Sequence, residues 1–178
     1  MGNLGHLWPR ANSTGIFVLM LYVHPMDWSL FFIFLASCGA AAATGAMFGP
    51  GDWYESLKKP SWTPPGWVFP VTWTTLYFCM SYAAMRAALA GDSDVALALW
   101  GLQIALNTLW SPVFFGLNRV GAALIVIGFL WLAVAATTVA FWMADPVAGA
   151  FFLPYLLWVT IAGALNASVL QLNRTVAA

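Results

Sequence analysis

The sequence predicts an all-α membrane protein: a bundle of five transmembrane helices with a Pro- and Trp-rich first loop acting as a lid. Of its residues, 62% are hydrophobic and 7% charged, whereas soluble domains carry about 25% charged residues. The apolar residues form continuous blocks, which favours helices because β-barrel strands alternate polar and apolar side chains. Five uncharged runs reach the ~20 residues that cross a bilayer: 28–51, 60–85, 95–118, 120–144 and 146–173.

Local signals divide the chain into its helices. Gly49-Pro50-Gly51 ends the first span, and Asp145-Pro146 precedes the fifth, because proline suits the first position of a helix. Asp52 and Glu55 fit a capping box that starts a short helix over about 53–58. The expected spans are about 28–48, 66–89, 95–116, 120–143 and 147–172, within a single domain over 26–178.

Residues 1–25 stand apart from this domain. The apolar stretch "GIFVLMLYV" is too short to cross a bilayer, and no clear cleavage site comes after it. We interpret Met26 as the natural start and 1–25 as an extension that is not native or is disordered.

The basic residues in the short loops predict the orientation, because Lys and Arg favour the cytoplasmic side. One side of the predicted membrane holds Lys58, Lys59, Arg119 and Arg174, and the other holds Arg10 and Arg86. This difference places the C-terminus inside and the N-terminus outside.

Several kinds of function are excluded by composition. The formal net charge of zero gives nothing to attract nucleic acid. No ionisable side chain lies in the middle of a predicted span, which argues against an ion-coupled pump. His6 and His24 precede the first span, so neither haem ligation by histidine nor Ser-His-Asp catalysis is expected. Cys38 and Cys79 lack metal-site spacing. We expect no metal and an apolar ligand held by shape and stacking.

Three predicted helices combine large rings with amides or hydroxyls on one face, since residues three or four apart are neighbours on a helix. The sets are Phe69, Trp73 and Tyr77; Asn107, Trp110, Ser111 and Phe114; and Pro154, Trp158, Ala162 and Asn166, with Tyr155 beside the last. Such faces suit a pocket for a flat aromatic ligand. Alternatively, the rings pack between helices or form interfacial belts and the asparagines only bridge helices. That alternative is preferred for Trp8, Trp28, Trp67, Trp100, Trp131 and Trp142.

The Pro-rich stretch 60–70 cannot continue a helix, because proline has no backbone N–H. Non-helical backbone survives at membrane depth only where protein shields it or it lines a wet cavity. We therefore expect this stretch to fold over the mouth of the bundle. Lys58 and Lys59 would flank the entrance and contact either lipid phosphates or ligand carboxylates.

Three separated motifs resemble those of one family: "WYESLKKPSWTPPGWVFPVTWTTLY" (53–77), "NTLWSPVFFG" (107–116) and "PYLLWVTIAGALN" (154–166). They are similar to the TspO/MBR family of translocator proteins, also called peripheral-type benzodiazepine receptors, over about 27–174. The resemblance implies a five-helix bundle, often a homodimer, that binds protoporphyrin IX, haem-like tetrapyrroles and, in animal members, cholesterol and drugs. In bacterial members it implies a regulatory role linked to tetrapyrroles, oxygen or light.

By this resemblance the ligand-binding positions are Tyr54, Trp62, Phe69, Trp73, Asn107, Trp110, Trp158 and Ala162. The resemblance also favours Gly101 and Ala105 as a dimer interface, a small-xxx-small face; Gly39 and Ala43 offer an alternative. The segment "SVLQLNR" lacks the tyrosine of the animal sterol motif, which puts cholesterol binding in doubt.

The function expected from these features is a membrane receptor or transport-type protein that binds porphyrins or other flat apolar ligands, in a bacterial membrane, with no required cofactor. The alternative is light- and oxygen-dependent porphyrin degradation. Because the spans hold no dedicated acid, base or metal, any such chemistry would belong to the ligand. A small-solute transporter without a mid-span charge or an inverted repeat is less favoured.

Overall fold

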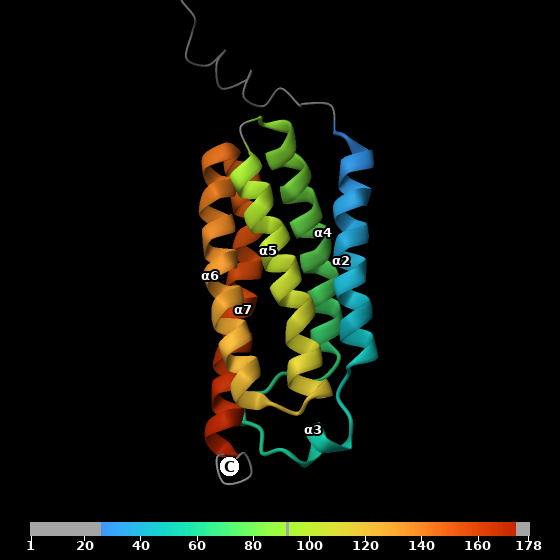
Figure 1. The fold of residues 1–178 in the computed structure, drawn as a ribbon, viewed down its shortest axis with the longest axis vertical. Coiled ribbons are helices and arrows are strands. Elements are labelled where there is room, and N and C mark those ends of the chain that lie inside the picture. The colour runs from blue at the N-terminus through green and yellow to red at the C-terminus, as the bar shows by residue number, and fades with distance from the viewer. Residues whose placement is uncertain (1–25, 92, 174–178) are drawn as a thin grey trace, which may run out of the picture.

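The described residues of the computed structural model, 26–91 and 93–173, form an antiparallel bundle of long helices (Figure 1). No strand occurs among these residues. The short helix α3 lies beyond one end of the bundle, here called the α3 end. The elements are α2 (Trp28–Met47), α3 (Asp52–Ser56), α4 (Val68–Leu89), α5 (Asp94–Ser111), the π-helix η1 (Pro112–Gly116), α6 (Val120–Ala144) and α7 (Pro146–Leu172). The N-terminal extension predicted for 1–25 lies outside the described residues.

The helix boundaries reflect local capping. Asp27 begins α2 by accepting hydrogen bonds from the backbone N–H groups of Ser29 and Leu30. Asp145 does the same for α7, with proline at the first helical position as predicted. The predicted capping box is wrong, since Asp52 is the first residue of α3 and no side chain caps that helix. Gly51, which has no side chain to cap with, occupies the cap position instead.

Four helical segments are long and apolar enough to cross a membrane: Trp28–Met47, Asp94–Gly116, Val120–Ala144 and Pro146–Leu172. α4 is also long, at 22 residues, but it is not among these four. Its lower apolarity comes from the hydroxyl-bearing Thr72, Thr74, Thr75 and Ser81 and from Arg86 near its end. The helical, membrane-spanning class is therefore confirmed, and a fifth crossing by α4 remains a prediction.

Pro112 explains why α5 ends in a π-helix. Proline has no N–H, so it cannot donate to the carbonyl of Thr108 four residues earlier. The backbone widens instead, and the N–H of Leu117 donates to the carbonyl of Pro112 at 2.8 Å. The hydroxyl of Thr44 in α2 donates to the carbonyl of Ala41 on its own helix at 2.7 Å and lies 3.5 Å from the carbonyl oxygen of Thr108. α2 therefore lies beside α5 just before α5 widens.

The opposite end of the bundle is closed by close packing and one ion pair. Met80, Ala83, Ala84 and Met85 of α4 are fully buried. Arg86 in α4 contacts Asp145, the cap of α7, at 2.7 Å. The candidate site lies in the α3 half of the bundle.

Candidate ligand cavity

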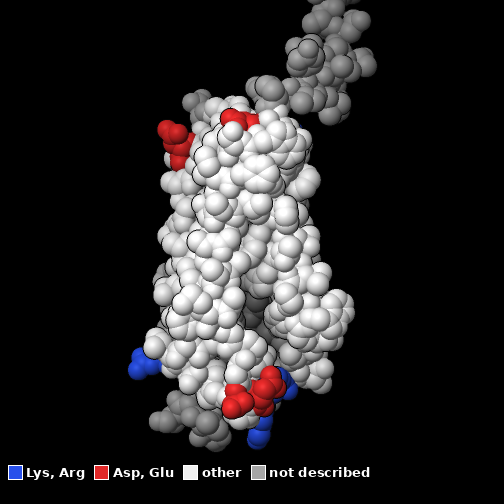
Figure 2. Space-filling view, turned by 90° about the vertical axis from the view of Figure 1, so that its right-hand side faces the viewer, with Lys and Arg blue, Asp and Glu red and all other residues white. Residues whose placement is uncertain are grey.

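A cavity of about 700 Å³ lies in the α3 half of the bundle. Each of the five long helices contributes to its wall, for example through Gly45, Trp73, Asn107, Leu130 and Trp158. The space-filling view shows the side of the molecule hollowed in this half, above the charged residues of the α3 end (Figure 2). Its volume falls within the ~300–1,000 Å³ typical of small-molecule sites.

Aromatic rings from α4, α5 and α7 meet around this space. The Phe69 ring lies edge-on to Trp158 with centroids 5.7 Å apart. Trp73 lies 5.5 Å from Tyr77 on its own helix. On the α5 side, Trp110 stacks on Phe114 at 4.9 Å and 23°. The wall thus presents ring surfaces from three helices, an arrangement that fits a flat apolar molecule.

Two asparagines organise the polar groups between these rings. Asn107 donates from Nδ2 to the hydroxyl oxygen of Tyr155 at 3.1 Å. Asn166 accepts at Oδ1 from the indole N–H of Trp110 at 3.2 Å and donates to the carbonyl of Val120 at 3.0 Å. Asn166 therefore joins α5, α6 and α7 and fixes the plane of the Trp110 ring. Asn107 and Asn166 therefore both bridge helices and line the cavity, so the two interpretations drawn from the sequence hold together.

One polar group in the wall is unsatisfied. The indole N–H of Trp158 is buried and has no hydrogen-bond partner among the described residues. A buried donor without a partner costs about 1–3 kcal/mol. Trp158 therefore lines the cavity with its ring, while its buried N–H is not accessible from the cavity.

The structure brings together seven of the eight predicted ligand-binding residues. They line the one cavity: Tyr54, Phe69, Trp73, Asn107, Trp110, Trp158 and Ala162. Trp62 is not part of this wall, and its side chain is 48% exposed. Pro154 is also outside the lining, one turn from Trp158. The predicted dimer residues Gly101 and Ala105 are exposed on the outer face of α5, where a partner could reach them.

The comparisons with known proteins agree with this geometry. A model of the TspO/MBR family matches residues 31–172. The chain belongs to the TspO/MBR family. It is similar to a "Tryptophan-rich sensory protein" of Cereibacter sphaeroides, with 55% identity over 148 residues, 83% of this chain and 94% of the relative. "Protein CrtK" of Rhodobacter capsulatus is 53% identical over 83% of this chain and 95% of its own. The human "Translocator protein" is 38% identical over 80% and 88%.

This TspO/MBR chain is therefore an integral membrane protein. The resemblance found in the three motifs is confirmed. Among the described residues, no group of three His, Cys, Asp or Glu side chains could hold a metal ion. The cavity wall offers rings, hydroxyls and amides to a ligand.

Charged residues of the α3 end border the cavity. Lys59 pairs with Glu55 at 2.8 Å and lies 4.4 Å from the centroid of the Tyr54 ring, a cation–π contact. Burial raises the pKa of the Tyr54 phenol above its ordinary value, and the positive charge of Lys59 partly opposes this shift. Tyr54 is thus a neutral hydrogen-bonding group at physiological pH.

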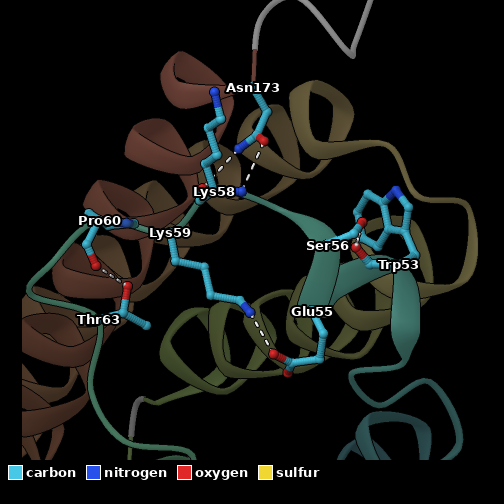
Figure 3. Close-up of polar contacts among 8 residues, drawn as sticks. All are labelled: Trp53, Glu55, Ser56, Lys58, Lys59, Pro60, Thr63 and Asn173. Atoms are coloured by element: carbon cyan, nitrogen blue, oxygen red, sulfur yellow. Dashed lines mark hydrogen bonds and ion pairs between the residues drawn. The ribbon is translucent and has the colours of Figure 1, made fainter.

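Asn173, which sequence reasoning missed, fastens the segment between α3 and α4. Its side chain accepts from the N–H of Lys58 at 3.0 Å and donates to the carbonyl of Lys58 at 2.9 Å (Figure 3). The same amide donates to the carbonyl of Val169 at 2.8 Å. Next to Lys58, Leu57 is buried against Phe114 and Val169. Because residues 58 and 173 are 115 positions apart, no local pattern could have revealed this contact.

Proposed function

We propose that this protein binds tetrapyrroles, such as protoporphyrin IX or a haem-like molecule, and other flat apolar ligands in the aromatic cavity. The observation that carries the proposal is the convergence of seven motif residues on one cavity of about 700 Å³. In this proposal binding serves a regulatory or translocating role. The names of the relatives, a sensory protein and a translocator protein, support that role.

The individual residues have distinct parts in this proposal. Trp73, Trp110 and Trp158 offer ring faces or edges to the ligand, while Tyr54 and Asn107 orient it through hydrogen bonds. Ala162 lies one turn after Trp158, and its small side chain leaves room in the cavity. A larger side chain there would crowd the ligand. The lid was expected over 60–70, but α4 already begins at Val68, so the segment 57–67 serves as the lid at the α3 end in this proposal. No separate cofactor or metal is needed for binding.

The wider assembly is part of the same proposal. α4 completes a bundle of five membrane-crossing helices, since it packs against both α2 and α7. The exposed small residues Gly101 and Ala105 form the interface of a homodimer. The close similarity to proteins of Cereibacter and Rhodobacter supports a bacterial membrane as the location.

A porphyrin titration tests this function. Purified protein in detergent should shift the absorption spectrum of protoporphyrin IX, with saturation at one site. Stacking contributes about 0.5–1.5 kcal/mol per ring pair. Trp158→Phe should therefore raise the Kd by about two- to tenfold, and the combined Trp73→Phe and Trp158→Phe change by about five- to a hundredfold.

Trp131→Phe is the matched control. Trp131 lies outside the cavity wall, is 40% exposed and donates to the hydroxyl of Thr160. Its replacement should leave the Kd unchanged. The proposed site is rejected if the double variant binds as tightly as the original protein, or if the Trp131 variant loses as much affinity.

A further inference from the structure

α2 and α4 separate in the α3 half of the bundle. In the other half they touch, with the Phe31 and Phe78 rings 6.3 Å apart. The hydroxyl of Ser81 also lies 3.6 Å from the sulfur of Cys38. Towards the α3 end, α2 lies beside α5, with the hydroxyl oxygen of Thr44 3.5 Å from the carbonyl oxygen of Thr108.

α4 is drawn the other way in this half, towards α7. Phe69 contacts Trp158, and Trp73 lies 6.0 Å from Tyr155. In this half the two helices therefore turn towards different neighbours, α2 to α5 and α4 to α7. The cavity lies between them.

The residues along this gap are small and exposed. Ala42 and Ala46 of α2, and Pro70 and Thr74 of α4, line the cavity and are also exposed on the outer surface. These four residues define the side slot. The wall residues of α5, α6 and α7 are by contrast buried or half-buried. The hollow in Figure 2 is on this side of the molecule.

The side slot reaches into the depth of the membrane. Ala42 lies five residues before the end of α2 and Thr74 six residues after the start of α4, which at 1.5 Å per residue is about 8–9 Å from the helix ends. No charged residue lies in α2, and none lies in α4 before Arg86, at its far end. The upper part of the slot therefore faces lipid chains.

Unlike the side slot, the α3 end of the cavity is held closed by specific contacts. Moving the segment 57–67 aside would break both hydrogen bonds between Asn173 and the backbone of Lys58. It would also expose Leu57, which is 8% exposed. The side slot is bordered instead by the small side chains of Ala42, Ala46, Pro70 and Thr74.

We infer that the cavity exchanges its ligand with the bilayer through the side slot, while Asn173 keeps the α3 end closed. The ligands admitted this way are flat apolar molecules dissolved in the membrane. This inference rests on the proposed function for the identity of the ligand, but the route itself derives from the helix arrangement.

Ala46→Trp tests the route by filling the slot. In liposomes loaded with protoporphyrin IX, stopped-flow measurements should show association and dissociation rate constants that both fall about tenfold, an added barrier of about 1.4 kcal/mol. Because Ala46 also borders the cavity, the association rate constant, which reports entry of the ligand, is the deciding quantity. Thr74→Trp narrows the slot from the α4 side and should give the same result, so misfolding of one variant does not decide the test.

Two further variants are matched to this experiment. Ala43→Trp adds the same ring to an exposed position of α2 that does not line the cavity, and both rate constants should remain at their original values. Asn173→Ala releases the α3 end and should also leave both rates unchanged. The inference is overturned if Asn173→Ala accelerates exchange while Ala46→Trp and Thr74→Trp have no effect.

A second measurement needs no porphyrin. In a protein with Cys38→Ala and Cys79→Ala, Ala162→Cys places one thiol in the cavity wall. A membrane-soluble maleimide added in liposomes should label this thiol, and Ala46→Trp should slow labelling about tenfold, again about 1.4 kcal/mol of barrier. Unslowed labelling contradicts the side route. Slowed labelling in a protein that binds no porphyrin keeps the route and rejects the proposed function.

Discussion

The two halves of the bundle use small residues in opposite ways. At the end away from α3, Gly149 lets α7 approach α6 so closely that an added Cβ would lie 2.7 Å from the Cα of Trp142. In the α3 half, Ala42, Gly45 and Ala46 of α2 border an open cavity instead. Small side chains allow close packing only when the facing helix moves in to meet them.

The α3 half is held apart by the pairing of helices through larger residues. α4 carries Phe69 and Trp73, whose rings rest on α7. α2 rests on α5 and η1, where a Cβ added to Gly116 would lie 2.8 Å from the Phe48 ring. The half away from α3 thus contributes close packing that stabilises the bundle. The α3 half keeps a cavity, whose size depends on how far α2 and α4 lie apart.

The largest effect on stability is expected at Gly149. Gly149→Ala forces a methyl group against the backbone of Trp142, and such overpacking costs about 1–3 kcal/mol. Gly116→Ala should cost less, since only the ring of Phe48, which is 36% exposed, has to move. Thermal unfolding in one detergent compares them. Gly128→Ala in α6, with no atom within 4 Å and away from the proposed dimer interface, is the control that measures the helix-propensity gain of alanine alone. An equal loss for the first two would remove the distinction drawn between the halves.

An intermediate effect is expected at Asp145, which has two roles at the closed end. It caps α7 and pairs with Arg86 at 2.7 Å. Asp145→Ala removes both roles and should cost about 1–2 kcal/mol, whereas Asp145→Asn keeps a good cap and should cost about 0.5 kcal/mol. The same unfolding measurement separates the roles. If the two variants are equally destabilised, the cap contributes nothing beyond the ion pair.

The smallest effect is expected at the α3 end. Glu55→Gln breaks the pair with Lys59, but the side chain of Glu55 is 70% exposed. An exposed pair is worth about 0–1 kcal/mol, so the unfolding temperature should hardly change. A loss as large as that of Asp145→Ala would show that this end contributes to stability as the closed end does.

The helices could be read from the sequence because their ends carry local signals. Gly49-Pro50 and Asp145-Pro146 place the end of α2 and the start of α7 within one residue of the predicted positions. The aromatic faces at three- and four-residue spacing also correspond to sides of the cavity, since a helix fixes which residues share a face.

Features that depend on distant residues could not be read in this way. Tyr155 was placed only beside a predicted stripe, yet it is fully buried and bonded to Asn107 on another helix. The widening at Pro112 was missed because the predicted third span continued through it. Trp62 belongs to the same loop motif as Tyr54, but its side chain does not line the cavity. The turns after Pro60 have no helical periodicity, so the sequence could not predict which of their side chains face the cavity.

The wide turn at Pro112–Gly116 restricts how the length of this protein can vary. A residue inserted between Trp110 and Phe114 has no wider turn to absorb it, because the stretch already holds one residue more per turn than an α-helix, and it would rotate Phe114 by about 100° relative to Trp110. Phe114, buried between Trp110 and the α3 segment, would then swing out of the wall. Insertions in this stretch should therefore be much less tolerated than conservative exchanges of its side chains.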